Sequence, residues 1–272
     1  MALPQYFTLN NGEKVPAVAL GTFQSDDGNS RVAATVKMAL ELGYRHVDGA
    51  ATYANEREIG LGIKSFGVPR SEIFVTSKLP QTAHHPGVVA KALQQTLSDL
   101  GLEYVDLYLM HFPHAYKADN NLQTIRHPSG NNKPVIDYEL SRYYAATWKA
   151  MEALVESGKA RSIGLSNFNI LKTRKLLETA NIIPAVNQVE LHPYLPQAEL
   201  VAFSRKHGIL VIAHQPLEAV LSGPYGPMKG SPDLLKMTRS GALRFLDPKP
   251  HIGFDIFDEE NDQPIDNKAP WD

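Results

Sequence analysis

The feature that most limits the fold of this chain is a series of short, almost continuously apolar runs separated by longer amphipathic segments. Examples are residues 105–110 (VDLYLM) and 209–213 (ILVIA). Apolar side chains on both faces of a strand are typical of parallel strands that are covered on both sides. At 272 residues, the chain is long enough for one large α/β domain with a substantial core.

These runs alternate with helical patterns along most of the chain. We expect an N-terminal hairpin with strands at 6–9 and 14–20 and a turn at 10–12. The expected strands that follow lie at 17–21, 45–50, 73–79, 105–111, 160–166, 185–191 and 210–214. The expected helices lie at 29–42, 55–65, 87–100, 143–157, 171–180 and 197–207. Seven strands alternating with helices predict an α/β protein, a (β/α)8 TIM barrel capped by the hairpin.

The competing architecture is a doubly wound open sheet. No G-x-G-x-x-G sequence follows the first strand, and polar residues recur at the end of strand after strand, which favours the barrel. We expect a single domain, 1–272, with the barrel at 7–217 and an irregular C-terminal loop and tail at 218–272. The barrel is expected to be incomplete at its eighth β/α unit, because no convincing strand and helix follow residue 217.

Two segments break the alternation. The first, 116–140, is polar and follows the fourth strand, so it is expected to overhang the barrel mouth as a functional or disordered loop. The second begins after residue 217, where 222–231 is rich in Gly and Pro and 233–237 has the length of one helical turn. Within the tail, 252–257 is the candidate for a strand that pairs with the barrel edge.

The composition excludes several classes of partner and chemistry. Lys and Arg number 27 against 29 Asp and Glu, so the net charge of −2 gives no reason to expect nucleic acid or an anionic membrane. Cys is absent, which rules out disulfides, thiolate metal sites and a Cys nucleophile and fits a reducing compartment. The first residues lack the features of a signal peptide, and no apolar stretch approaches the ~20 residues of a membrane span. We expect a cytoplasmic monomer.

Four polar residues fall near the C-terminal ends of three successive expected strands: Asp48, Tyr53, Lys78 and His111. In a parallel barrel these ends meet at one mouth, so the four side chains are expected to converge there. A phenol is a weak acid at neutral pH, and a nearby ammonium stabilises its phenolate form. A Lys that emerges from an apolar strand needs a partner, which Asp48 supplies. The set predicts a proton-transfer site.

Structural alternatives exist for each of these residues. Tyr53 alone is more often a packing residue, Asp48 with Lys78 a structural ion pair, and His111 a satisfied core histidine. His111 and His114 have a metal-like spacing, but the sequence offers no HExxH motif and no Cys cluster, and we expect no metal.

At these residues the chain resembles the aldo-keto reductase family. The resemblance rests on residues 43–53 (GYRHVDGAATY), the strand that ends in Lys78, and residues 106–113 (DLYLMHFP), and it extends from about 7 to about 217. The family fold is a (β/α)8 barrel closed at its base by an N-terminal hairpin. The resemblance implies that Tyr53 is the general acid, that Lys78 and Asp48 tune it, and that His111 orients a carbonyl.

The resemblance also implies a nicotinamide cofactor, usually NADPH, with NADH as the alternative. Ser166 and Asn167 at the end of the fifth strand, and Gln188 at the end of the sixth, match the residues that hold the carboxamide, which needs a donor and an acceptor in fixed orientation. Without the resemblance, the alternative stays open that Asn167 and Gln188 are strand-end caps or turn formers. The full set of cofactor residues that the resemblance implies is Thr22, Asp48, Ser166, Asn167, Gln188, His214, Gln215 and Leu217.

The substrate is expected to be a small carbonyl compound whose identity the sequence does not specify. The candidate pocket residues are Phe23, Tyr53, His111 and Phe112, and Tyr225 and the loop 116–140 are further candidate walls.

The chain departs from the family pattern in two places. The seventh strand ends in His214-Gln215, where the family usually has an aromatic residue followed by Ser. The family then continues with a helix, an eighth strand and a further helix that hold the adenosine and its phosphate. Here an internal deletion at about 237–240 is inferred. The basic residues near it are substitute phosphate ligands or solvated surface charges, and they are Lys229, Lys236, Arg239 and Arg244.

Three functions are therefore consistent with the sequence. The first is NAD(P)H-dependent reduction of an aldehyde or ketone to an alcohol with Tyr53 as the general acid. The second is a cofactor-independent isomerase, dehydratase or cyclase that uses the same acid site for proton transfer alone. The third is an inactive, truncated binding protein, because an open barrel exposes a strand edge and apolar core.

Overall fold

The computed structural model describes residues 5–24, 28–128, 132–192, 195–216, 257–258 and 263–264. The chain begins with an antiparallel hairpin, in which β1 (Tyr6–Thr8) pairs with β2 (Lys14–Pro16). The strands that follow form one sheet whose members are all parallel, in the order β11-β10-β9-β6-β5-β4-β3. Their bounds are β3 (Leu20–Gly21), β4 (His46–Asp48), β5 (Phe74–Leu79), β6 (Val105–Met110), β9 (Ala160–Ser166), β10 (Val186–Glu190) and β11 (Leu210–His214).

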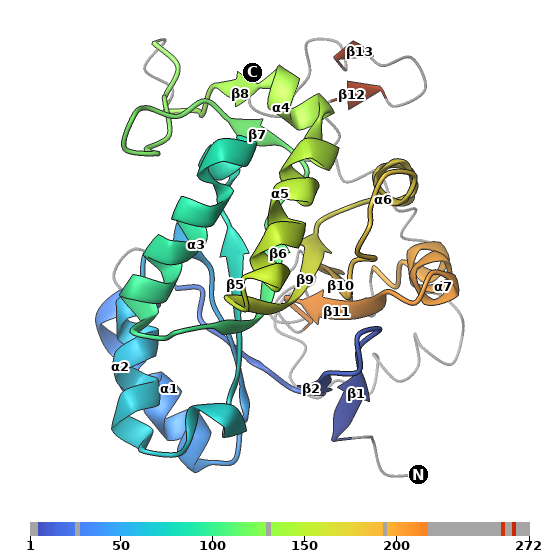
Figure 1. Cartoon of the computed structure of the whole chain (residues 1–272). Helices are drawn as coiled ribbons and strands as arrows, with labels where there is room; N and C mark the ends of the chain where they lie inside the picture. Colours follow the sequence, from blue (N-terminus) through green and yellow to red (C-terminus); the bar gives the residue numbers. More distant parts are fainter. Residues whose placement is uncertain are drawn as a thin grey trace, which may run out of the picture.

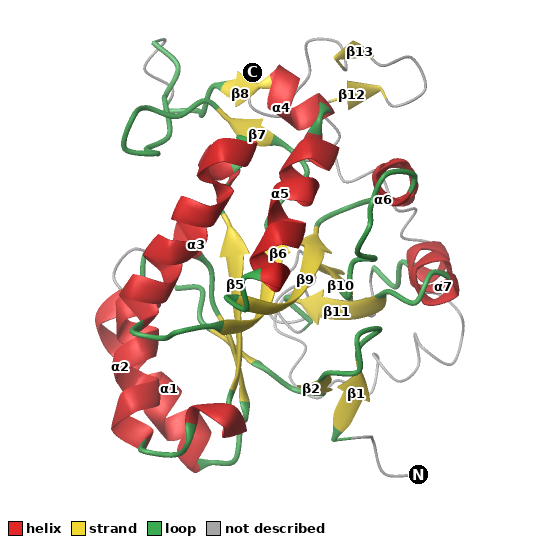
Figure 2. Ribbon diagram, viewed as in Figure 1, coloured by secondary structure: helices red, strands yellow, loops and turns green. Residues whose placement is uncertain are grey.

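The sheet curls into a nearly closed barrel with its helices on the outside (Figures 1 and 2). These helices are α1 (Val32–Glu41), α2 (Glu56–Phe66), α3 (Pro86–Leu100), α5 (Tyr144–Glu156), α6 (Ile170–Leu177) and α7 (Ala198–Lys206). Single turns of 3-10 helix occur at η1 (Asn29–Arg31), η2 (Ala51–Tyr53), η3 (Arg70–Glu72) and η4 (Gln81–Ala83). The predicted incomplete (β/α)8 barrel with an N-terminal hairpin is confirmed, and among the described residues β3 and β11 are the two edges of the sheet.

The apolar run of β6 is buried on both faces, as expected from the sequence, whereas β11 at the edge of the sheet is only half-buried. Along β6, Leu107 and Leu109 belong to the cluster inside the barrel, whereas Tyr108 and Met110 belong to the larger cluster between the sheet and the helices. Successive side chains of a strand point to opposite faces, so a strand between two apolar layers must be apolar at every position.

The hairpin closes the amino-terminal end of the barrel. The Asn10 amide donates to the carbonyl oxygens of Ile183 (3.2 Å) and Pro184 (3.0 Å). The Asn11 amide donates to the Ser162 hydroxyl at 2.9 Å. Since the base is closed, the carboxyl ends of the strands form the accessible mouth.

The edge strand next to the hairpin is shorter than predicted. The expected strand 14–20 ends at Pro16, which lacks an N–H, and the expected strand 17–21 shrinks to Leu20–Gly21. Among the described residues, β3 pairs with β4 alone. A segment with one neighbour keeps fewer ladder hydrogen bonds, and Val18 is exposed rather than packed.

The segment 116–140 is more ordered than an unstructured loop. It contains part of a two-stranded sheet, in which β7 (Ala115–Tyr116) pairs with β8 (Ile136–Asp137), and it leads into α4 (Tyr138–Arg142). The Ser141 hydroxyl accepts from the Ala115 amide at 2.8 Å and ties the helix to the strand. As predicted, β7 and β8 lie at the end toward which β5 and β6 run (Figure 1), but none of the described residues of 116–140 lines the cavity that opens at the mouth.

The predicted pairing of 252–257 with the barrel edge is wrong at Phe257. There β12 (Phe257–Asp258) pairs antiparallel with β13 (Gln263–Pro264) in a separate two-stranded sheet. Phe257 and Asp258 thus pair with residues a few positions further along the chain and not with the barrel edge. Residues 252–256 and the segments 222–231 and 233–237 lie outside the described residues.

Close packing of α2 on α3 makes Gly60 intolerant of a side chain. A Cβ at Gly60 would lie 2.1 Å from the carbonyl oxygen of Leu100. We expect Gly60→Ala to lower the free energy of unfolding in urea by about 1–3 kcal/mol. The control is Gly87→Ala, where the nearest atom is 3.3 Å away in the exposed His85 ring. Equal stability of the two variants would contradict the expectation.

Candidate active site

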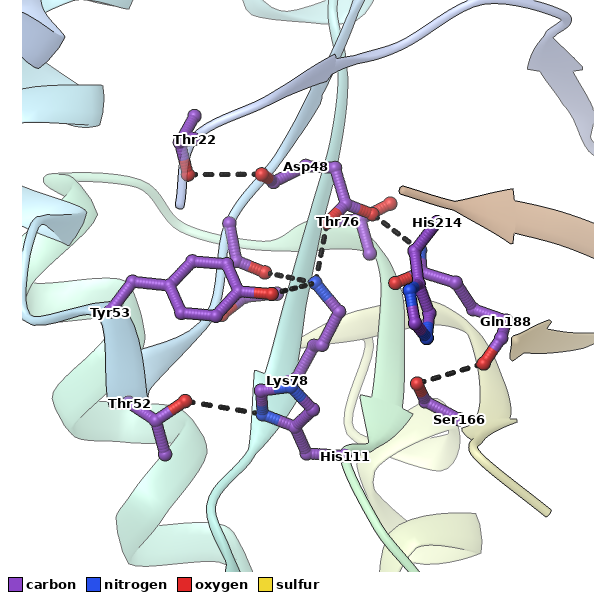
Figure 3. Close-up of polar contacts among 12 residues, drawn as sticks. Thr22, Asp48, Thr52, Tyr53, Thr76, Lys78, His111, Ser166, Gln188 and His214 are labelled. Atoms are coloured by element: carbon purple, nitrogen blue, oxygen red, sulfur yellow. Dashed lines mark hydrogen bonds and ion pairs between the residues drawn. The ribbon is translucent and has the colours of Figure 1, made fainter. Parts of the chain in front are cut away.

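The barrel brings side chains from β4, β5, β6, β9, β10 and β11 to one mouth (Figure 3). Asp48, Ser166 and His214 are the last residues of β4, β9 and β11. Lys78 lies one residue before the end of β5, and His111 follows the last residue of β6 directly. Parallel pairing places the carboxyl ends of these strands side by side, which is why residues far apart in sequence meet here.

Lys78 is at the centre of the group. Its side chain is 1% exposed, and its Nζ donates to Asp48 Oδ1 (2.5 Å) and to the carbonyl oxygen of Gly49 (2.8 Å). The Tyr53 hydroxyl lies 3.4 Å from the same Nζ. Burial alone lowers the pKa of Lys78, but the Asp48 charge and the Tyr53 hydroxyl outweigh it, so the pKa is raised above its ordinary value. The lysine is therefore a buried, permanently charged ammonium beside a phenol.

Asp48 connects this group to the opposite side of the barrel. Its second oxygen, Oδ2, accepts a hydrogen bond from Gln188 Nε2 at 2.7 Å. Its backbone oxygen accepts from the Thr22 hydroxyl at 3.0 Å. The carboxylate is thus held from β5 and β10, and it orients both the ammonium and the Gln188 amide.

His111 is a neutral ring beside the phenol. Its Nδ1 lies 3.2 Å from the Thr52 hydroxyl, and its ring meets Tyr53 edge to face with 5.7 Å between centroids. Burial, and then the Lys78 charge, lower the pKa of His111 well below its ordinary value. A neutral imidazole whose Nδ1 accepts from Thr52 carries its proton on Nε2, which can then donate to a ligand oxygen.

A cavity of about 1370 Å³ opens onto these groups. Phe23 and Phe112 supply apolar walls at its mouth, because Phe23 packs edge-on against Tyr53 at 5.2 Å and Phe112 stacks on His111 at 4.9 Å. From the mouth the cavity continues between β3 and β11 past His46 and Leu210. All four predicted pocket residues therefore line one space.

The predicted nicotinamide residues line the same cavity. The Ser166 hydroxyl donates to the Gln188 carbonyl oxygen at 2.9 Å, and the Asn167 amide donates to the His111 carbonyl oxygen at 3.0 Å. His214 Nε2 lies 2.9 Å from Asn167 Oδ1. Two amides and a hydroxyl on one wall offer the donors and acceptors that a carboxamide requires, so these residues fit the nicotinamide end of the cofactor.

The other predicted cofactor residues are only partly accounted for. Thr22 and Gln215 line the cavity as well. Asn167 and Gln215 both have positive φ values, 61° and 51°, which turn the chain sharply at the ends of β9 and β11. Leu217, the inferred deletion and the four basic residues near it lie outside the described residues.

The sequence did not single out two residues that hold His111 and the backbone of Tyr53 in place. Thr52 contacts His111, and Asn29 Nδ2 donates to the Tyr53 carbonyl oxygen at 3.2 Å. Thr52 directly precedes Tyr53 and is the polar residue in a run of small ones, so the sequence could have indicated it. Asn29 is 24 residues away in sequence, and its role depends on how η1 packs beside η2.

Two further buried histidines, His84 and His114, lie beside the mouth. Burial, with the other histidine nearby, lowers the pKa of His84 to about 3. Burial and the Lys172 charge lower the pKa of His114 to about 3. His114 approaches the Tyr116 hydroxyl (3.3 Å), whereas His111 faces Thr52, so the two histidines with metal-like spacing serve different contacts.

The described part of the chain contains no group of three or more His, Cys, Asp or Glu residues that is placed to hold a metal ion. None of its helices has both the length and the apolar character that crossing a membrane requires.

Comparisons with known proteins agree with the geometry. The model of the aldo/keto reductase family matches residues 17–231. Aldo-keto reductase family 1 member A1 of Gallus gallus is 49% identical over 217 residues, which cover 78% of this chain and 64% of that protein. The Homo sapiens protein of the same name is 48% identical over 215 residues, which cover 77% and 63%. The chain thus spans less than two thirds of the length of these relatives.

Solved structures show the same likeness. The aldose reductase of Schistosoma japonicum matches with a TM-score of 0.75 and 37% identity over 88% of this chain and 75% of that one. The Bombyx mori aldo-keto reductase in complex with NADP matches with a TM-score of 0.71 and 36% identity over 89% and 77%.

Removing the ammonium should destabilise the fold as well as the site. Lys78→Met leaves the Asp48 carboxylate buried without its cation, and we expect a loss of about 3–5 kcal/mol in urea unfolding. Lys37→Met is the matched control, because Lys37 pairs with Glu41 on the exposed face of α1 and its loss should cost less than about 1 kcal/mol. A Lys78→Met protein as stable as the control would refute the buried pair.

The buried histidines should make the fold acid-sensitive. The imidazole of an unfolded chain has a pKa of ~6.5, whereas burial lowers the pKa of His84 in the folded protein to about 3. Below pH ~6.5 the unfolded state therefore binds more protons, so stability falls as the pH falls. We expect His84→Phe to reduce the stability lost between pH 7 and 5 by about 2 kcal/mol. Between pH 7.5 and 9 the variant and the native protein should show parallel curves; divergence there would contradict this assignment.

Proposed function

Because the chain belongs to the aldo/keto reductase family, as its motifs suggested, we propose that it reduces an aldehyde or ketone to an alcohol with NADPH, or with NADH as the alternative. The observation that carries the proposal is the row Asp48–Lys78–Tyr53, in which a buried ion pair lies beside a phenol at the cavity mouth. The bound NADP of the Bombyx mori relative supports a nicotinamide cofactor.

Tyr53 and His111 are proposed to bind the carbonyl oxygen. The phenol hydroxyl and the neutral imidazole are on the same wall of the cavity, with their rings edge to face. An oxygen between them accepts a hydrogen bond from each, and this polarises the C=O bond without placing a second positive charge beside Lys78. Phe23 and Phe112 then face the carbon side of the substrate, which favours carbonyl compounds with apolar substituents.

Ser166, Asn167 and Gln188 are proposed to hold the carboxamide of the nicotinamide. When bound, the reduced nicotinamide supplies a hydride to the carbonyl carbon. Gln188 also donates to Asp48, so the wall that orients the cofactor is tied to the carboxylate that orients Lys78. Binding of the adenosine end of the cofactor would depend on residues beyond 216. Titration with NADPH measures that affinity.

Tyr53 is proposed to complete the reduction by giving its proton to the substrate oxygen. The phenolate that remains lies next to the Lys78 ammonium, which is fixed by Asp48 and the Gly49 carbonyl before the reaction begins. Charges that are already oriented stabilise the developing anion without further reorganisation. Both carboxylate oxygens of Asp48 already accept hydrogen bonds, from Lys78 and Gln188, so Tyr53 and not Asp48 is the proposed acid.

Substitution of the phenol tests this assignment. We expect Tyr53→Phe to lower kcat for NADPH-dependent reduction of small aldehydes by about 100- to 10,000-fold. The dissociation constant for NADPH, measured by fluorescence quenching, should change little because the variant keeps the nicotinamide wall. The control is Tyr44→Phe, which alters a phenol at the other end of β4.

Two outcomes would overturn the proposal. Absence of binding at millimolar NADPH and NADH would exclude the redox function. Turnover without any nicotinamide that Tyr53→Phe abolishes would instead support the isomerase, dehydratase or cyclase, which uses the same acid for proton transfer alone.

A further inference from the structure

The phenol of Tyr53 does not come from a strand. Tyr53 is the last residue of the single-turn helix η2, and the next residue, Ala54, has a left-handed backbone with φ 54°. One turn of 3-10 helix followed by a left-handed residue has little rigidity of its own. The Tyr53–Lys78 distance of 3.4 Å must therefore be set by contacts of the neighbouring residues.

One side of this turn is held by Asn55. Its buried side chain donates to the Thr22 carbonyl oxygen (2.8 Å) and to Asn29 Oδ1 (3.1 Å). Asn29 in turn donates to the Tyr53 carbonyl oxygen. These contacts connect the turn to the end of β3, but they do not reach the strand that carries Lys78.

Glu56 makes that second connection. It is the first residue of α2 and is only 7% exposed. Its Oε1 accepts from the Ser77 hydroxyl at 2.6 Å, and its Oε2 accepts from the Thr96 hydroxyl at 3.2 Å. Burial raises the pKa of Glu56, and the hydrogen bonds from Ser77 and Thr96 oppose that rise. Burying a carboxylate here costs folding free energy. Its hydrogen bonds are therefore expected to have a role that an apolar side chain could not fill.

The Glu56–Ser77 bond closes a ring around the acid. Ser77 and Lys78 are consecutive in β5, so their side chains point to opposite faces of the sheet, Ser77 toward the helices and Lys78 into the barrel. The chain runs from Tyr53 to Glu56, across the hydrogen bond to Ser77, on to Lys78, and back to the Tyr53 hydroxyl. A shift of α2 relative to β5 therefore changes the distance between phenol and ammonium.

We propose that Glu56 is a positioning residue, which sets the distance between the Tyr53 phenol and the Lys78 ammonium through its bond to Ser77. Glu56 lies outside the barrel and is not among the residues that line the cavity. The effect on turnover rests on the proposed reductase function, whereas the effect on the position of Tyr53 does not.

Kinetics of matched variants test the proposal. Glu56→Ala and Ser77→Ala should each lower kcat roughly 10- to 100-fold, since a displacement of about 1 Å is sufficient for such a loss. KM should change less than about twofold. Because both variants delete the Glu56–Ser77 bond, the double variant should be no slower than the slower single variant. Glu56→Gln should retain most of the activity, since its amide oxygen still accepts from Ser77.

A second buried carboxylate provides the control. Glu152 in α5 is 6% exposed and accepts from the backbone amides of Asn181 (2.7 Å) and Ile182 (2.9 Å), which precede β10 at the end of the sheet opposite the mouth. Glu152→Ala should lower the Tm without changing kcat. If Glu56→Ala does not fold, Ser77→Ala removes the same bond. Additive effects, or equal loss of kcat in Glu152→Ala, would reduce Glu56 to a stability residue and overturn the proposal.

An NMR measurement separates this proposal from the proposed function. In protein labelled with ¹³C-tyrosine, the Tyr53 ring signal is assigned by its loss in Tyr53→Phe. We expect this signal to shift or broaden in Glu56→Ala and Ser77→Ala and to stay in place in Glu152→Ala. Movement of the signal in a protein that lacks reductase activity would support the positioning role and reject the function. An unmoved signal in both Glu56→Ala and Ser77→Ala would reject the positioning role whatever the activity.

Discussion

The mouth of this barrel depends on one buried ion pair, between Lys78 of β5 and Asp48 of β4. Both groups are removed from water, which is costly unless each keeps several partners. Lys78 has Asp48, Gly49 and Tyr53, and Asp48 has Gln188 and a backbone contact from Thr22. The pair therefore organises polar contacts from both sides of the barrel, and a change in either member reaches all the others.

Burial, and after it the same charge, keeps the neighbouring His111 ring neutral. His111 is buried next to a permanent cation, and both conditions favour the neutral imidazole. A neutral donor, a phenol and an ammonium on one wall form an arrangement that stabilises a negative oxygen better than a neutral one. The outer side of β5 contributes through Ser77, which anchors the turn that carries the phenol.

Much of this organisation was predictable from local sequence. The strands at 160–166 and 210–214 were predicted with the bounds that the structure has, because short runs rich in apolar residues between helical patterns are typical of parallel strands. Asp48, Lys78 and His111 were identified because a charged or polar residue at the end of such a strand is conspicuous. The paired strands β7 and β8 were missed, since each has two residues and their pairing spans a polar loop. Thr52 and Asn29 were missed because they act through hydrogen bonds to residues 59 and 24 positions away in the chain.

The sequence by itself determined the order of strands and helices, the apolar character of both faces of the sheet, and which strands end in chemically active side chains. It did so because hydrophobic periodicity and strand ends are local properties of the chain. Only the tertiary structure decided that Gln188 holds Asp48 from 140 residues away and that Glu56 ties the turn of Tyr53 to the strand of Lys78. Hydrogen bonds of about 3 Å depend on how strands and helices are placed relative to one another, and that placement is a property of the packed whole.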